Sequence, residues 1–168
     1  MKYLFILFIL FVSFKSYAQT TAQDYFQAGD DKAWNGDFKG AIPYFTKAIE
    51  LTPKGDADVF YHYRGNCKAH IKDYQGAIDD YTIALKIDPK SSSAYADRAK
   101  AREALKNYKG AIEDYTKCIE LTPYGDDYYK RGNAKMKAGD KSGACVDLKK
   151  ADELGNKDAE EAISKYCK

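Results

Sequence analysis

A pattern of small, aromatic and turn-forming residues recurs four times along the 168-residue chain, at intervals of 36, 34 and 33 residues. Each copy has an alanine, a large side chain four residues later and a small residue seven residues later, which together lie on one face of a helix. These sets are Ala41, Phe45 and Ala48; Ala77, Tyr81 and Ala84; Ala111, Tyr115 and Cys118; and Ala144, Leu148 and Ala151. A period of this length is typical of proteins whose repeats stack into an elongated array.

A second helical pattern precedes each of these sets. It has a tyrosine and, four residues later, a glycine or alanine that allows a partner helix to approach closely: Tyr25 and Gly29, Tyr61 and Gly65, Tyr95 and Ala99, and Tyr128 and Gly132. Turn-forming residues separate the two patterns at 36–38, 72–74, 106–108 and 139–141. Prolines at Pro53, Pro89 and Pro123 end three of the second helices. We expect Pro43 to fall near the first turn of its helix, where a missing N–H matters least.

This order of aromatic, small and proline residues, at a period near 34, resembles the tetratricopeptide repeat family. The resemblance covers about residues 22–155 and implies an all-α fold, a right-handed α-solenoid of four helix–turn–helix repeats. The repeats are expected at about 22–55, 58–91, 92–124 and 125–156. The departures are a two-residue insertion near Lys54 and a fourth copy that ends at Leu154 without a proline. Residues 157–168 are predicted to form a helix that caps the apolar edge of the last repeat.

The first 18 residues differ from the rest of the chain. Lys2 precedes an apolar run over residues 3–12, and Ser16 and Ala18 lie before Gln19, which is the order of a secretory signal peptide. The alternative is an uncleaved anchor, although a membrane-spanning helix needs about 20 apolar residues. We therefore expect residues 1–18 to direct export to the periplasm or the extracellular space, and a mature chain without a membrane span.

Composition excludes some classes of function. Removal of residues 1–18 leaves 27 − 2 = 25 basic and 25 acidic side chains, a formal net charge of zero. A nucleic-acid-binding protein would carry a basic excess, so we expect no nucleic-acid partner. The sequence contains no catalytic serine elbow, phosphate-binding loop or H-E-x-x-H motif, and we expect neither an enzyme nor a bound cofactor.

The four cysteines have no C-x-x-C spacing, which argues against a zinc site. Cys67 and Cys118 stand where other copies have alanine, so both are predicted to be buried. Cys145 replaces the isoleucine of the other copies, and Cys167 lies in the terminal helix that should pack there. We therefore predict a Cys145–Cys167 disulfide, which an oxidising compartment would permit.

An arginine and an aspartate lie 16 residues apart in three of the copies: Arg64 and Asp80, Arg98 and Asp114, and Arg131 and Asp147. The first copy has Ala28 and Tyr44 at these positions and so lacks both partners. Because the arginine and the aspartate are present together or absent together, the pattern favours an ion pair that joins the two helices of one repeat. The alternative is that these arginines bind a ligand.

In the family that the chain resembles, the first helices line a concave groove for a peptide or a partner surface. Carried over by position, the groove residues are Phe26, Asp30 and Trp34; His62, Asn66 and His70; Lys100 and Glu103; and Tyr129, Asn133 and Lys137. Phe26 and Trp34 could instead only cover the exposed N-terminal edge. His62 and His70 begin about 12 Å apart on one helix, too far to share a metal ion. Acidic and neutral residues, including Asp30 and Asp97, argue against capture of a chaperone carboxylate.

The sequence therefore predicts a non-enzymatic scaffold of the cell envelope that binds a protein or peptide of unknown identity in its groove. One alternative is binding of a glycan or small ligand at the aromatic N-terminal end. Another is an accessory protein that works through weak self-association into a homo-oligomer. Fold alone does not decide among these functions.

Overall fold

The structure is a computed structural model that describes residues 20–167, and the signal predicted at residues 1–18 lies outside them. The described chain contains nine helices and no strand. Four helix pairs and one final helix follow in order: α2 (Ala22–Trp34) and α3 (Phe38–Leu51), α4 (Asp58–His70) and α5 (Tyr74–Ile87), α6 (Ser92–Ala104) and α7 (Tyr108–Leu121), α8 (Gly125–Lys137) and α9 (Lys141–Glu153), and α10 (Ala159–Tyr166). In this range no helix is long and apolar enough to cross a membrane.

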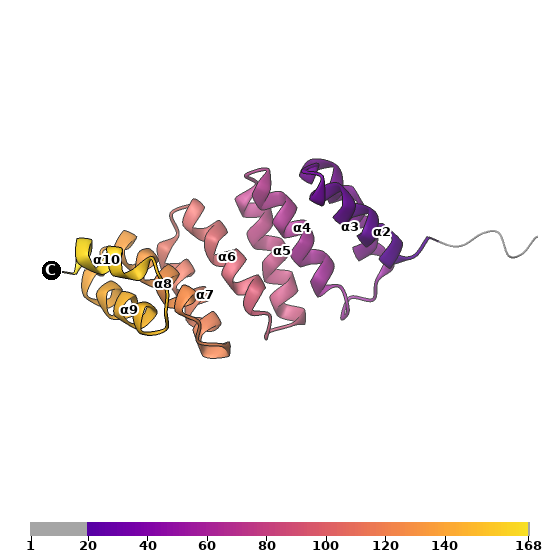
Figure 1. Cartoon of the computed structure of the whole chain (residues 1–168). Helices are drawn as coiled ribbons and strands as arrows, with labels where there is room; N and C mark the ends of the chain where they lie inside the picture. Colours follow the sequence, from indigo (N-terminus) through magenta and orange to yellow (C-terminus); the bar gives the residue numbers. More distant parts are fainter. Residues whose placement is uncertain (1–19, 168) are drawn as a thin grey trace, which may run out of the picture.

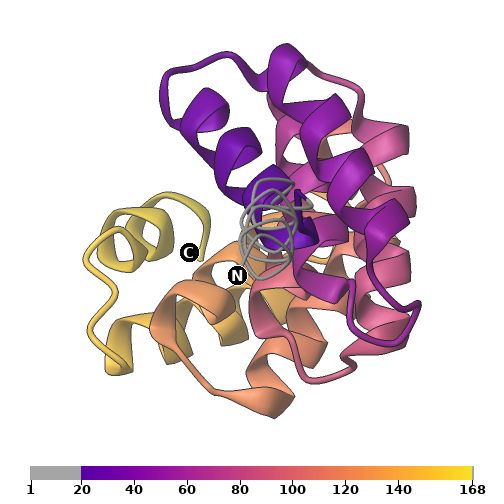
Figure 2. The ribbon, with the colours of Figure 1, turned by 90° about the vertical axis from the view of Figure 1, so that its right-hand side faces the viewer.

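Each helix packs mainly against its neighbours in the sequence, so the pairs stack in a row from α2 to α10 (Figure 1). Seen along that row, successive pairs turn about a common axis (Figure 2). The predicted all-α solenoid of four helix pairs with a final helix is confirmed.

The second helix of every pair begins in the same way. Asp37, Asp73, Asn107 and Asp140 are the N-caps, and each side chain accepts a hydrogen bond from a glycine N–H three residues later, at 2.9–3.1 Å. Such a cap satisfies a backbone donor that the first turn leaves without a partner. Glycine is required there because a Cβ at Gly40 would overlap the Asp37 carboxylate.

Large side chains from the second helices form the core of each layer. Phe45, Tyr81, Tyr115 and Leu148 are at most 1% exposed, as the shared helical face predicted. The ring of Tyr81 lies against Gly65, where an added Cβ would come within 2.7 Å of it. The small residues of the first helices thus set how closely the two helices of a pair approach.

One detail of the first pair differs from expectation. Pro43 is the sixth residue of α3, beyond the first turn, and its side chain is exposed. Because proline has no N–H, the carbonyl of Lys39 loses its usual partner four residues later. The helix nevertheless continues to Leu51, because its Ala41, Phe45 and Ala48 face is fully buried.

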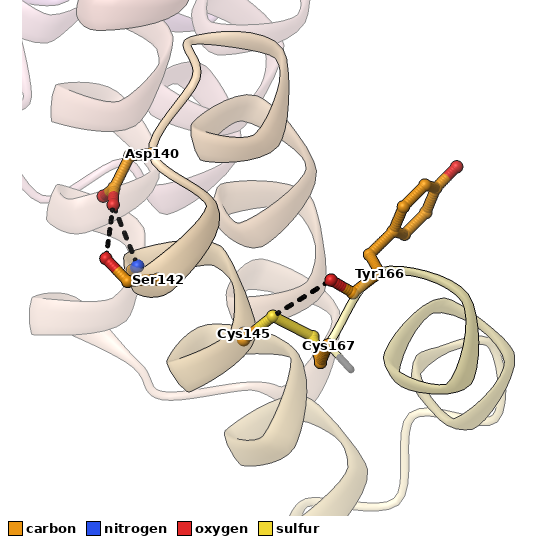
Figure 3. The surroundings of a disulfide bond; sticks show 6 residues. Asp140, Ser142, Cys145, Tyr166 and Cys167 are labelled. Carbon is orange, nitrogen blue, oxygen red and sulfur yellow. Dashed lines mark hydrogen bonds between the residues drawn. A yellow bond between two sulfur atoms is a disulfide. The ribbon is translucent and has the colours of Figure 1, made fainter.

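The C-terminal helix α10 closes the last repeat. Ala159 and Ala162 are buried against it, and a disulfide joins Cys145 of α9 to Cys167, with 5.6 Å between their Cα atoms (Figure 3). Cys67 and Cys118 are buried free thiols. The bridge therefore attaches the end of the chain to α9 instead of relying on the short helix alone.

Candidate partner-binding groove

Two neighbouring cavities lie between the first helices of the second and third repeats. The larger, about 510 Å³, is called here the Tyr74 pocket and is lined by Asn66, Ala69, His70, Tyr74, Tyr81, Asp97, Lys100, Ala101 and Ala104. The smaller, about 450 Å³, is called the Ser93 pocket and is lined by Asp58, Val59, His62, Tyr63, Asn66, Ala84, Asp88, Ser91 and Ser93. Asn66 borders both, so the two pockets are adjoining parts of one groove.

A polar cluster crosses the middle of this groove and links two repeats. Nε2 of His62 lies 3.0 Å from one carboxylate oxygen of Asp97, and Nζ of Lys100 lies 2.9 Å from the other. Burial by itself would raise the pKa of Asp97, but the hydrogen bonds from His62 and Lys100 outweigh it and lower that pKa. Asp97 is thus an anion at neutral pH, held between two basic side chains.

Asn66 is oriented by the core beneath it. The hydroxyl of Tyr81 donates to Oδ1 of Asn66 at 2.7 Å, and burial raises the pKa of this tyrosine, which keeps the hydroxyl protonated. With the oxygen occupied, the amide N–H groups of Asn66 are the groups that can meet a ligand. An amide in this setting can donate to a peptide carbonyl.

The two histidines have separate partners. The ring of His70 stacks on Phe38 of the preceding repeat, with centroids 3.9 Å apart and planes 2° from parallel. His62 instead pairs with Asp97. Among residues 20–167, no group of three or more His, Cys, Asp and Glu side chains is arranged to hold a metal ion.

The N-terminal end of the predicted groove is less aromatic than expected. Phe26 packs against Phe45, Phe60 and Tyr63, with ring centroids 5.0–5.8 Å apart. This half-buried ring therefore contributes to the packing between the first two repeats. Trp34, by contrast, is 91% exposed.

At the other end, contacts within the chain occupy several of the predicted groove residues. Glu103 accepts hydrogen bonds from the Tyr115 hydroxyl at 2.9 Å and from Lys137 of the next repeat at 2.6 Å. Tyr129 and Asn133 line a cavity of about 230 Å³ that α10 closes from one side. The accessible groove is thus centred on α4 and α6.

The arginine–aspartate pairs form between the two helices of the second, third and fourth repeats. Two guanidinium nitrogens of each arginine donate to both oxygens of its aspartate at 2.7–3.0 Å, in the pairs Arg64–Asp80, Arg98–Asp114 and Arg131–Asp147. The three aspartates are 2% exposed. Because both charges find their partner within the chain, the geometry favours the structural interpretation over ligand-binding arginines.

Two further sets of residues belong to this network and were not predicted from the sequence. Each aspartate also meets a second basic side chain at 2.8 Å, from Lys68, Arg102 or Lys135. Each arginine donates to a threonine hydroxyl of the preceding repeat, from Thr46, Thr82 or Thr116. The signal was present in the sequence, because both sets recur at the repeat period.

Stacked helix pairs with a groove along their first helices are the architecture of an α-helical repeat protein. The family profile described as "Tetratricopeptide repeat" matches residues 35–54 and 92–124. This match identifies tetratricopeptide repeats in these two segments, and the remaining helix pairs have the same fold.

Solved structures share the fold. A crystal structure of MamA is 24% identical, with a TM-score of 0.76 over 89% of this chain and 84% of that one. The first TPR of Spaghetti (RPAP3), bound to the HSP90 peptide SRMEEVD, is 22% identical, with a TM-score of 0.66 over 71% of this chain and 97% of that one. A tetratricopeptide repeat protein from Parabacteroides merdae is 21% identical, with a TM-score of 0.75 over 81% and 54%. No curated protein sequence is significantly similar to the chain.

Proposed function

We propose that this protein is a non-enzymatic scaffold of the cell envelope that binds a partner protein, or a peptide segment of one, in the groove between α4 and α6. The observation that carries the proposal is the pair of adjoining cavities that share Asn66. Because the Tyr81 hydroxyl bonds to Oδ1 of Asn66, the N–H groups of that amide are available to a ligand. The place in the envelope rests on the sequence of residues 1–18 alone.

The Spaghetti complex supplies a precedent for a peptide on a tetratricopeptide-repeat domain. The ligand here is expected to differ in charge. Asp97 lies in the groove as an anion, and Asp30 of the first repeat stands at the position that Asn66 has in the second. An acidic peptide end would meet like charge at both places, so a neutral or basic segment fits better.

The two other functions that the sequence left open have less support. A glycan site would need several free aromatic rings, yet Phe26 is engaged in packing and only Trp34 remains exposed at that end of the described chain. Self-association through the N-terminal edge would need an apolar face. The outward residues Asp24, Gln27 and Asp31 of α2, and its C-cap Asn35, are polar and exposed.

The test is site-specific photo-crosslinking in the native host. p-Benzoylphenylalanine replaces Ser93, an exposed residue of the Ser93 pocket, and in a matched variant it replaces Lys109, which is exposed on α7. We expect one or a few envelope proteins to crosslink from position 93 and not from position 109. Identical crosslinking patterns from both positions would show that the groove is not the binding surface.

A further inference from the structure

The Tyr74 pocket lies at a junction between repeats that lacks the ring stack found at the preceding junction. At the junction of the first two repeats, His70 ends α4 and covers the ring of Phe38, which begins α3. One repeat later, Ala104 ends α6 and Tyr74 begins α5. Both of these residues line the pocket. A methyl group thus stands where the preceding junction has an aromatic ring.

The other walls of the pocket suit a flat, mostly apolar group with one polar edge. Ala69, Ala101 and Ala104 contribute methyl groups, and Tyr74 contributes its ring. Asp97 and Lys100 of α6 also line the pocket, and a carboxylate there can accept a hydrogen bond from an indole N–H or a phenol O–H. Aromatic pairs stack favourably beyond the apolar area they bury.

We propose that the Tyr74 pocket receives an aromatic side chain of the partner, which stacks on Tyr74 as His70 stacks on Phe38. This inference rests on the proposed function and names the chemistry of the segment that binds. The molecule itself contains the stacking geometry, one repeat away and at a centroid separation of 3.9 Å. The occupant is a residue of a polypeptide, because the adjoining Ser93 pocket and Asn66 continue the groove beyond the ring.

The experiment uses two pentapeptides, Gly-Gly-Trp-Gly-Gly and Gly-Gly-Leu-Gly-Gly, and the free compound N-acetyltryptophan amide. Binding is followed by NMR of the Ala69 and Ala101 methyl groups, which line the pocket. The protein is tested as wild type and as Ala104→His, which would place an imidazole on Tyr74. Ala138→His, at the exposed end of α8, is the matched control.

We expect the tryptophan peptide to bind roughly twofold to tenfold more tightly than the leucine peptide, the factor that one aromatic stack contributes. Ala104→His should weaken tryptophan binding by a similar factor, whereas Ala138→His should not. Equal binding of both peptides, no methyl response to either, or unchanged binding by Ala104→His would each overturn the inference. Free N-acetyltryptophan amide binding as tightly as the peptide would overturn the assignment to a polypeptide.

The two proposals fail in different ways. If a partner still crosslinks from position 93 in the Ala104→His variant with undiminished yield, the aromatic anchor is wrong and the groove remains the binding surface. If the tryptophan peptide binds as expected but no envelope protein crosslinks from position 93, the pocket is real and the proposed scaffold function is wrong.

Discussion

Asp114 shows at residue scale how the repeats are held together. Its carboxylate is 2% exposed and accepts hydrogen bonds from Arg98 and Arg102. Removing one partner of a buried ion pair leaves an uncompensated charge, which costs far more than loss of an exposed pair. The network therefore constrains the angle between α6 and α7, and Arg98 also contacts Thr82 of the preceding repeat.

We predict that Asp114→Ala lowers the free energy of unfolding by about 3–5 kcal/mol. Urea denaturation measures this value. In a double-mutant cycle with Arg98→Ala, the two losses should be strongly non-additive. The exposed Glu120→Ala, which breaks the pair with Lys117, serves as control and should have a much smaller effect. Additive losses in the cycle would argue against the pairing.

Asp97 gives the groove a defined response to acid. Because hydrogen bonds from His62 and Lys100 lower its pKa in the folded state, the stabilisation is present above the unfolded pKa of 3.8 and is lost as pH falls through the folded value. We predict that the stability of the wild type falls more steeply below about pH 4 than that of Asp97→Asn. Urea denaturation from pH 3 to 7, with the exposed Asp152→Asn as control, measures the difference. Parallel acid profiles of the wild type and Asp97→Asn would contradict it.

At the scale of one helix pair, Gly65 sets the distance between α4 and α5. A Cβ at this position would lie 2.7 Å from Cε1 of Tyr81, whose ring is buried and whose hydroxyl bonds to Asn66. The third repeat has the buried Ala99 at the same place, so that helix pair accommodates a methyl group which the second pair does not.

We predict that Gly65→Ala lowers the free energy of unfolding by roughly 1–3 kcal/mol, the usual cost of overpacking. Gly55→Ala is the matched control, because a Cβ at Gly55 meets no atom within 4 Å and its φ is not positive. Thermal or urea denaturation of both variants measures the effect. Equal stability of the two variants would contradict the prediction, because it would show that Tyr81 moves to accommodate the added methyl group without loss of stability.

The disulfide acts at the scale of the C-terminal helix α10. A bridge across a sequence separation of 22 residues is expected to stabilise the folded state by roughly 3 kcal/mol in the chain-entropy description. Burial raises the pKa of the Cys67 and Cys118 thiols to about 11, so neither is expected to react readily in the folded protein.

Thiol counting tests this assignment. We predict that the denatured, unreduced protein has two reactive thiols and that reduction raises the number to four, because Cys145 and Cys167 are then released. Cys167→Ser should lower stability by about the bridge contribution and expose the α9–α10 contact first. Four thiols before reduction would exclude the bridge.

The two ends of the whole molecule differ from its interior repeats. In α4, Phe60, Tyr63 and Cys67 pack against the preceding repeat, whereas the related residues of α2 are polar and exposed. The other end is covered by α10. Terminal repeats of a solenoid need such outer faces to stay soluble.

We therefore predict a monomer, because the outer side of α2 is mostly polar and α10 packs on α9. Size-exclusion chromatography with light scattering, over a range of concentrations, measures the mass in solution. A second sample that lacks residues 156–168 should associate more readily, since the apolar side of α9 is then exposed. Concentration-dependent dimers of residues 19–168 would contradict the prediction.

Local periodicity determined most of the fold. The caps at Asp37 and its counterparts, the face of Ala41, Phe45 and Ala48, and the helix pairs all depend on residues within one repeat, whose spacing is visible in the sequence. The pairing of Arg98 with Asp114 was predictable for the same reason, because a repeated 16-residue spacing relates two helices of one pair.

The groove was decided by contacts between repeats. His62 meets Asp97 across 35 residues, and Lys137 meets Glu103 across 34. The sequence placed His62, Glu103 and Lys137 on the groove but did not include Asp97 in that set. Which residues pair with one another depends on how closely successive repeats approach and how far each turns about the common axis. Only the packed structure specifies that geometry, and it decides that Phe26 packs against Tyr63 while Tyr74 borders an open pocket.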